Sequence, residues 1–230
     1  AATTAGAFQS DQGKGINIKG GRDEGTQYYI DGVKVTGVPT LPATSIEQLQ
    51  VITGGIPAKY GDVTGGIVNI TSKGPSSQFN GGVEVQTSQG LDAYGYNLVN
   101  GNLTGPIWKQ KSTHKTIIGF FAAFEYLRQQ DANPSAVGVW QVRQNVLDSL
   151  RQFPLVKKET DKGFNLRAEE VTFKDMYKQK VKPNTVDQSF RGTGRIDIRP
   201  TDNITLAFGG SATYHKYHTW VEQYTLFNSD

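Results

Sequence analysis

Two segments of strictly alternating side chains constrain the fold most strongly. In residues 189–199, hydroxyl or charged side chains occupy every second position and apolar or small residues the positions between, so the charges Arg191, Arg195, Asp197 and Arg199 fall on one face. Residues 204–214 alternate again after a short turn at 200–203. Successive side chains of a strand point to opposite faces, so the pattern predicts an antiparallel hairpin with one apolar and one polar face. Strands of about ten residues suit a tilted crossing of a bilayer.

Three earlier segments, around 83–86, 94–103 and 116–127, predict further strands with less regular alternation. In the third, one face is apolar, and the other mixes apolar residues with a single charge, Glu125. A connection of about sixty residues, 131–187, separates this strand from the alternating hairpin. Such a connection is uncommon in compact soluble domains, whereas outer-membrane barrels carry long loops at one end and short turns at the other.

Within this long connection, apolar residues recur at helical spacing between Pro134 and Pro154. They predict an amphipathic helix of about 15 residues. The following segment, 157–182, is of mixed charge and is predicted to be irregular.

The first 74 residues are composed differently, with short apolar runs punctuated by glycine. Residues 15–19, 27–30, 33–35, 50–53 and 67–72 predict short strands, and Asp31–Gly32 suits a two-residue hairpin turn. Residues 42–49 predict one or two helical turns capped by Thr44 and Glu47. Together these elements predict a small α+β domain with a mixed sheet of about four strands.

Composition excludes several classes of protein. The chain has no Cys, which rules out disulfides and thiolate chemistry. Its 24 Lys+Arg against 21 Asp+Glu give a net charge of only +3, too small and too evenly spread to indicate nucleic-acid binding. No apolar run is long enough for a spanning helix, but barrel strands carry a weaker hydropathy signal and stay possible.

Five blocks of the N-terminal segment occur in the order found in one family. They are Ile16–Arg22, Tyr29–Val33, Ser45–Val51, Gly54–Gly61 and Gly65–Ile70. Together they resemble the plug domain of TonB-dependent outer-membrane transporters, particularly of the Bacteroidetes type. The residues that carry this plug signature are Gly20, Gly21, Arg22, Asp31, Gly32, Glu47, Gly54, Gly55, Tyr60, Gly61, Gly65, Gly66 and Asn69.

The resemblance implies a plug domain over residues 1–76 and, over 77–230, about five strands of a roughly 22-stranded barrel in the outer membrane of a Gram-negative bacterium. It further implies energy-driven nutrient uptake, with TonB and its inner-membrane complex as partners, contact with outer-membrane lipid, and a surface lipoprotein lid or other envelope subunits as further candidates. No segment before Gly15 matches the TonB-contacting segment of the family. Because five strands cannot close a barrel, we expect a longer polypeptide or completion by another chain.

Candidate functional residues are few. Arg191, Arg195, Asp197 and Arg199 are expected to face the lumen, and Arg22 and Glu47 are candidates for charged contacts there or with each other. The glycine pairs at 20–21, 54–55 and 65–66 suit either tight turns or close contacts. Tyr214, Tyr217 and Trp220, with Tyr224, are expected to form an aromatic girdle at the outer rim.

Chemical motifs are weak. His215 and His218, with Glu222 beyond, would fall on opposite faces of a strand and therefore do not predict a metal site. No catalytic set or cofactor motif occurs, so the chain is not predicted to be an enzyme. The leading hypothesis is active transport. The alternatives are a surface receptor without transport, which would use the 131–187 loop for capture, and a structural or gating subunit of a larger complex.

Overall fold

The N-terminal sheet has four strands in the order β4-β3-β6-β5. The computed structural model describes residues 7–9, 15–61, 63–111, 113–157, 163–201 and 203–221. The four strands are β3 (Thr26–Ile30), β4 (Val33–Val35), β5 (Ile46–Ile52) and β6 (Gly66–Ser72). β3 and β6 are parallel and the other pairs antiparallel, so the predicted mixed sheet is present.

A short antiparallel ribbon lies beside this sheet, and 3-10 turns precede two of its strands. The ribbon pairs β1 (Ala7–Gln9) with β2 (Ile16–Ile18), and η1 (Asp23–Gly25) precedes β3. Buried Ile16, Ile18, Tyr28, Val68 and Ile70 form the core of this region. The Tyr28 hydroxyl also accepts a hydrogen bond from the Ile16 N–H at 3.0 Å, which fixes β2 over the sheet.

The predicted hairpin turn at Asp31–Gly32 is present. Asp31 has φ 49° and Gly32 φ 82°, both in the left-handed region that a two-residue hairpin turn requires. The turn therefore presents the Asp31 carboxylate at the end of the sheet.

The one or two helical turns predicted at 42–49 are reduced to a single 3-10 turn, and the predicted capping is wrong. Only η2 (Ala43–Ser45) is helical, its N-cap Pro42 has no capping side chain, and β5 begins at Ile46. Residues of β5 pair with β6 from Ile46↔Ser72 to Ile52↔Ile67, so sheet pairing overrides the local capping signal. Glu47 is a strand residue and caps nothing.

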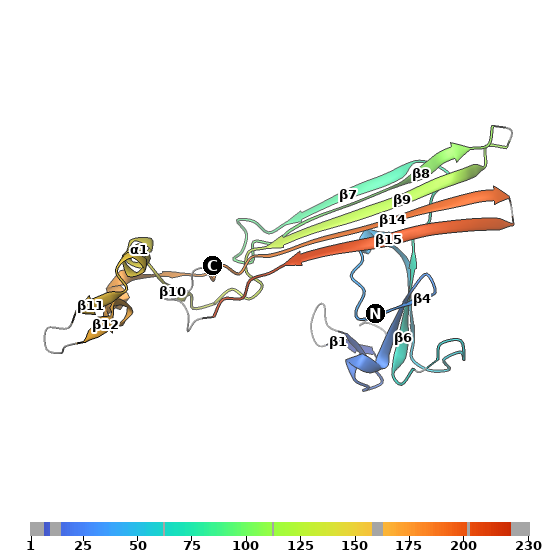
Figure 1. Ribbon diagram of the computed structural model, residues 1–230. Helices are drawn as coiled ribbons and strands as arrows, with labels where there is room; N and C mark the ends of the chain where they lie inside the picture. Colours follow the sequence, from blue (N-terminus) through green and yellow to red (C-terminus); the bar gives the residue numbers. More distant parts are fainter. Residues whose placement is uncertain are drawn as a thin grey trace. The chain divides into compact units, whose positions relative to one another are not determined.

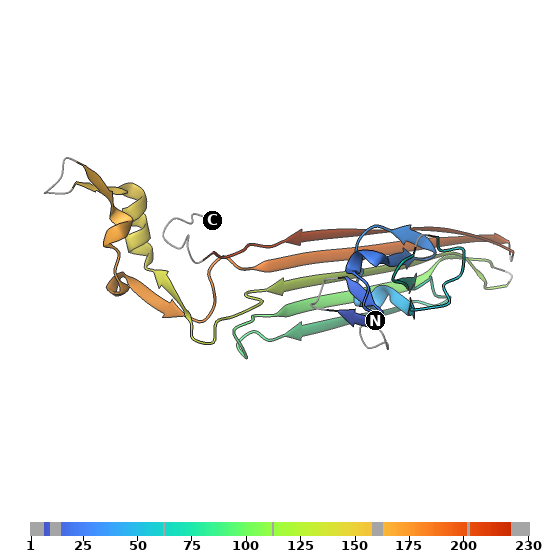
Figure 2. The ribbon, with the colours of Figure 1, turned by 90° about the horizontal axis from the view of Figure 1, so that it is seen from below.

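The second sheet has five strands in the order β15-β14-β9-β8-β7, lying side by side in both views (Figures 1 and 2). They are β7 (Asn80–Thr87), β8 (Asn97–Lys109), β9 (Thr116–Gln129), β14 (Asp187–Thr201) and β15 (Ile204–Lys216). This confirms the predicted antiparallel strands. β8 differs from expectation, since it begins at Asn97 and runs on through Pro106.

The two faces of the five-stranded sheet differ in burial as the alternation requires. In β9, Phe121, Ala123 and Glu125 are buried whereas Ala122 and Phe124 are exposed. In β14 the polar residues Ser189 and Asp197 are buried, and the intervening apolar side chains Phe190 and Ile196 are exposed. The sheet therefore turns its polar face inward, which inverts the arrangement of a soluble protein.

The chain divides into two compact units. The first holds the N-terminal sheet with Val99–Tyr126 and Ser189–Tyr214, and the second is built mainly from Leu127–Gln188. In the second unit, β10 (Val139–Val142) pairs with β13 (Met176–Gln179), and β11 (Leu155–Lys157) with β12 (Phe164–Leu166). Helix α1 (Gln144–Gln152) and the 3-10 turns η3 (Arg167–Glu170) and η4 (Phe173–Asp175) connect them.

Two expectations for the 131–187 segment are therefore wrong. The apolar residues from Val139 onward form a strand followed by a nine-residue helix rather than one helix of about 15 residues. The 157–182 stretch contains β12, η3, η4 and β13 and is not irregular throughout. Buried Val139 and Val142 pack as strand residues because β13 pairs with them, a long-range contact that local spacing does not show. None of the described helices is long and apolar enough to span a membrane.

Candidate functional site

The candidate site is the polar face of the five-stranded sheet, where the N-terminal sheet contacts it within the first unit. Arg195 of β14 lies at the first contact. Its Nε donates to Asp197 Oδ1 at 2.7 Å, and its Nη1 lies 3.9 Å from Oδ2 of Asp31 in the hairpin turn. Asp31 also accepts from the backbone N–H of Ser72 at 2.8 Å and from the Ser72 hydroxyl. Asp31 thus ties the turn to the end of β6 and carries a charge that faces Arg195.

Asp197 holds two guanidinium groups. The carboxylate is only 3% exposed, and Arg199 Nη2 lies 3.7 Å from its Oδ2, beside the closer bond from Arg195. Two arginines facing one buried carboxylate leave a net positive charge, which the opposed Asp31 carboxylate balances. Glu47 of β5 lies within electrostatic range of the same Arg195 group.

A second contact involves Glu125, which is 6% exposed. Arg191 Nη1 donates to its Oε1 at 2.5 Å, and the backbone N–H of Ala43 donates to its Oε2 at 3.4 Å. A buried carboxylate requires such partners, because an unpaired charge away from water is costly. This pair connects β9 with β14 and, through Ala43, both strands with η2.

A third contact is a hydroxyl pair. Thr40 Oγ1 and Thr213 Oγ1 lie 3.1 Å apart, on the chain before η2 and on β15. All three contacts are polar and none is large. They therefore hold the two sheets together with groups that water can replace.

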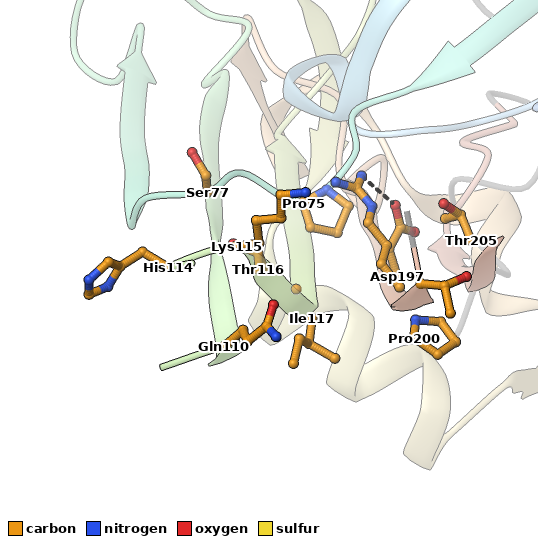
Figure 3. Close-up of a pocket in the computed structure, with 13 residues that line it drawn as sticks. Pro75, Ser77, Gln110, His114, Lys115, Thr116, Ile117, Asp197, Pro200 and Thr205 are labelled. Carbon is orange, nitrogen blue, oxygen red and sulfur yellow. Dashed lines mark ion pairs between the residues drawn. The ribbon is translucent and has the colours of Figure 1, made fainter. Parts of the chain in front are cut away.

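Some polar atoms on this face are buried without a described protein partner, among them Asn100 Oδ1, Ser189 Oγ and Arg191 Nε. A hollow of about 520 Å³ lies on the same face at the end of the strands (Figure 3). Asp197 and its ion pair line it, together with Pro75, Thr116 and Thr205. A polar hollow of this size holds water or a small polar solute.

The plug-signature residues lie mostly within the N-terminal sheet and its turns. Gly66 is the most tightly enclosed, since a Cβ there would lie 2.5 Å from Ile18 Cδ1 and 2.9 Å from the Ile52 carbonyl oxygen. Gly65 donates its N–H to the Gly25 carbonyl at 3.0 Å. Gly20 and Gly55 adopt positive φ in turns, and Gly21, Gly54 and Gly61 lie beside them in connecting segments.

Three further signature side chains have distinct surroundings. The Tyr60 ring packs edge-on against Tyr29 at 4.9 Å. Asn69 of β6 lies opposite Tyr29 and Gln50, with its Oδ1 buried and without a described partner. Arg22 is exposed just before η1.

Of the candidate girdle residues, Tyr214 lies near the C-terminal end of β15, and Tyr217 and Trp220 follow the strand. Tyr214 and Tyr217 are both well exposed, and Trp220 is half-buried. Tyr217 contacts the ring of His215, whose Nε2 lies 2.7 Å from Asp187 Oδ1. Tyr224 and Glu222 lie outside the described residues. Among the residues that are described, no group of three His, Cys, Asp or Glu side chains could hold a metal ion.

Sequence reasoning missed the contact residues Thr40, Ser72 and Ala43, and it noted Glu125 only as part of a mixed face. The first three offer no signal, because they act through a hydroxyl or the backbone. Glu125 does offer one, since a single carboxylate within an otherwise apolar strand predicts a buried partner.

Comparisons with known proteins identify this architecture. Residues 2–67 match the TonB-dependent Receptor Plug Domain family. The Probable TonB-dependent siderophore receptor PirA of Acinetobacter baumannii is 28% identical over 127 residues, which is 46% of this chain and 17% of that protein.

Solved structures agree on the fold. The crystal structure of the siderophore receptor PirA from Pseudomonas aeruginosa matches with TM-score 0.55 and 16% identity, over 92% of this chain and 30% of that receptor. A mutant of the ferric enterobactin receptor PfeA from the same organism matches with TM-score 0.55 and 17% identity, over 91% and 29%. The chain thus spans less than a third of the length of these proteins.

The fold and these matches define a plug domain followed by part of an outer-membrane barrel. Residues 2–67 carry a TonB-dependent receptor plug domain, as the sequence blocks indicated. Receptors with this domain reside in the outer membrane of Gram-negative bacteria, which agrees with the predicted location. The relatives named above come from Acinetobacter and Pseudomonas, so the Bacteroidetes-type likeness stays a prediction.

Proposed function

We propose that this chain forms the plug and the first barrel strands of a transporter that takes up a nutrient across the outer membrane, driven by TonB. The observation that carries the proposal is the contact between the plug and the polar face of the barrel strands. Asp31, Ala43 and Thr40 of the plug meet Arg195, Glu125 and Thr213 of the strands. A plug held by a few exchangeable polar contacts can seal a lumen and still be displaced.

In this proposal the polar face lines the lumen and the apolar face contacts lipid. Arg191, Arg195, Asp197 and Arg199 then serve the lumen, and Tyr214, Tyr217 and Trp220 lie in the girdle at the outer rim. The 131–187 segment becomes an extracellular loop, because it connects β9 to β14 and, in alternating strands, that connection belongs to the other end from the short turns that follow β8 and β14.

The relatives suggest only which class of substrate should be tested first. The named relatives are receptors for siderophores, so ferric siderophores are the first candidates. TonB and its inner-membrane complex supply the energy by family membership. A lipoprotein lid or another envelope subunit remains a further prediction.

The test locks the plug to the barrel in the full-length protein. Thr40→Cys combined with Thr213→Cys places two thiols where two hydroxyl oxygens now lie 3.1 Å apart, close enough for a disulfide. This chain contributes no other Cys to complicate the cross-link. We expect uptake of a radiolabelled ferric siderophore to stop on oxidation and to return on reduction, with the two single-Cys variants as controls.

Two results would contradict the proposal. Full uptake by completely cross-linked protein would show that the plug does not move at this contact. Uptake that persists after the proton gradient is collapsed would show that transport is not energy-driven. Tight binding with no uptake by the unmodified protein would instead favour the receptor without transport.

A further inference from the structure

The described parts of the 131–187 segment, residues 131–157 and 163–187, form a folded arm whose two ends are joined by hydrogen bonds. The buried carboxylate of Asp131 accepts the backbone N–H groups of Asn133 at 2.9 Å and Lys182 at 3.0 Å. Thr185 Oγ1 donates to the Gln130 carbonyl at 3.0 Å, which closes the two ends of the segment. The arm therefore has described surfaces that can each be considered for what they would bind.

One of these surfaces combines two exposed aromatic rings with cations. Trp140 of β10 and Phe173 of η4 pack edge-to-face with centroids 5.4 Å apart, yet they are 44% and 72% exposed. Lys178 is the cross-strand partner of Trp140, and its Nζ lies 5.9 Å from the centre of the indole ring. We call Trp140, Phe173 and Lys178, with the adjacent Lys174, the aromatic–cationic surface.

The charge on this surface is positive. Asp175 is the acidic neighbour within the same turn, but its Oδ2 accepts from both the backbone N–H and the hydroxyl of Thr172, each at 2.9 Å. Arg143 and Lys174 also act on this carboxylate electrostatically. Lys174 is thus shared with Asp175, and Lys178 is the cation of this surface that is left to attract an anion from solution.

The exposure of the rings limits what the ligand can be. The surface is open, so the ligand must gain its contact area by lying on the rings rather than by entering a pocket. A sugar does this with the C–H face of its ring, while its hydroxyls remain in water. A phosphate on the same sugar would reach the lysines as a charge-assisted partner. An acidic peptide supplies the charge but lacks the flat C–H face that two exposed rings fit.

We infer that the aromatic–cationic surface binds a phosphorylated saccharide, namely the headgroup of the glycolipid in the outer leaflet of the same membrane. The inference rests on the proposed function only in placing the arm outside the cell. That leaflet brings phosphorylated sugars to the surface of any outer-membrane protein.

The experiment measures binding by the full-length protein in detergent, using the phosphorylated core oligosaccharide released from purified lipopolysaccharide. The same oligosaccharide after removal of phosphate, neutral dextran and poly-glutamate serve as comparison probes. We expect binding of the phosphorylated form to weaken about tenfold when phosphate is removed, and to weaken with added salt because the attraction is between charges. Lys178→Gln and Phe173→Ser should each reduce affinity about tenfold.

Phe164→Ser is the matched control. Phe164 lies on β12 of the same arm and is 67% exposed, so it tests for loss of any exposed phenyl ring. Affinity should not change in this variant. The inference is overturned if phosphorylated and dephosphorylated forms bind equally, if Phe164→Ser weakens binding as much as Phe173→Ser, if poly-glutamate binds more tightly than the saccharide, or if no probe binds. Retained saccharide binding in a protein that fails to transport would refute the proposed function alone.

Discussion

The N-terminal sheet and the five-stranded sheet are both built from β-strands, but they bury opposite kinds of side chain. The first encloses Ile18, Tyr28 and Val68 and shows polar residues at its turns. The second leaves Phe190, Ile196 and Phe208 exposed and buries Glu125 and Asp197. The pattern of burial thus distinguishes a domain that packs apolar side chains in its core from a barrel sheet that has an apolar face for lipid and a polar face for water.

Glycine has a different role in each sheet. In the N-terminal sheet, Gly66 lies where β2 crosses β6 and no side chain fits. In β15, Gly210 has no atom within 4 Å of the position that a Cβ would take. The first glycine serves close packing, whereas the second occupies open space on the apolar face. This comparison implies four predictions of decreasing size.

The largest effect is expected where the two regions meet. Arg191→Met leaves the buried Glu125 carboxylate without its cationic partner and should lower the free energy of unfolding by about 4 kcal/mol. Arg199→Met is the matched control. Arg199 is half exposed and lies as far as 3.7 Å from Asp197, so its loss should cost less than about 1 kcal/mol. Urea unfolding of the full-length protein in lipid vesicles measures both. Equal losses would mean that Glu125 is not buried in the assembled barrel.

The second prediction tests which face contacts lipid. Ala122→Arg places a charge on the apolar face of the central strand β9 and should cost about 3 kcal/mol in a bilayer. Ser211→Arg introduces the same side chain on the polar face of β15, beside a hollow of about 530 Å³, and should cost far less. The measurement is again unfolding from vesicles. A larger loss for Ser211→Arg would reverse the assignment of the two faces.

The third prediction tests the two roles of glycine. Gly66→Ala should destabilise the plug by about 2 kcal/mol, because the added methyl group overlaps Ile18 and the Ile52 carbonyl oxygen. Gly210→Ala should change stability by less than about 0.5 kcal/mol, because the methyl group meets nothing within the chain. Protease accessibility of the plug, followed against temperature, reports the first. A tolerated Gly66→Ala would show that β2 does not pack tightly on β6.

Predictions from the sequence succeeded where a local sequence pattern determines the local structure, as a two-residue alternation does for a strand. The alternation in β14 and β15 is strict, so the two strands and their polar face could be predicted. Their length could not, since β14 has 15 residues and β15 has 13 where about ten were expected. The hairpin turn at Asp31–Gly32 was predictable for a similar reason, since few dipeptides tolerate positive φ at both positions.

Sequence reasoning failed where a distant strand decides the outcome. Thr44 and Glu47 have the spacing of a capping box, yet the box does not form because β6 pairs with β5. A capping box does form between Thr172 and Asp175, which sequence reasoning passed over as irregular chain. The plug–barrel contacts were equally hidden, because Ala43 donates through its backbone and Thr40 is one threonine among many.

The smallest expected effect concerns that capping box in the arm. Hydrogen bonds from the backbone N–H and then the hydroxyl of Thr172 hold the pKa of the Asp175 carboxyl below its usual value of 3.8. A carboxyl whose pKa is lowered by folding stabilises the folded form while it is ionised. The contribution is therefore complete above pH 3.8 and is lost as the pH falls through the lowered value.

Selective ¹⁵N labelling of threonine should show the Thr172 amide signal moving only below pH 3.8, and Asp175→Asn should abolish this movement. Asp148→Asn, which changes another exposed carboxylate of the arm, should leave the movement of the Thr172 signal intact. If the Thr172 signal still moves in the same way in Asp175→Asn, the Asp175 carboxyl is not the group that titrates.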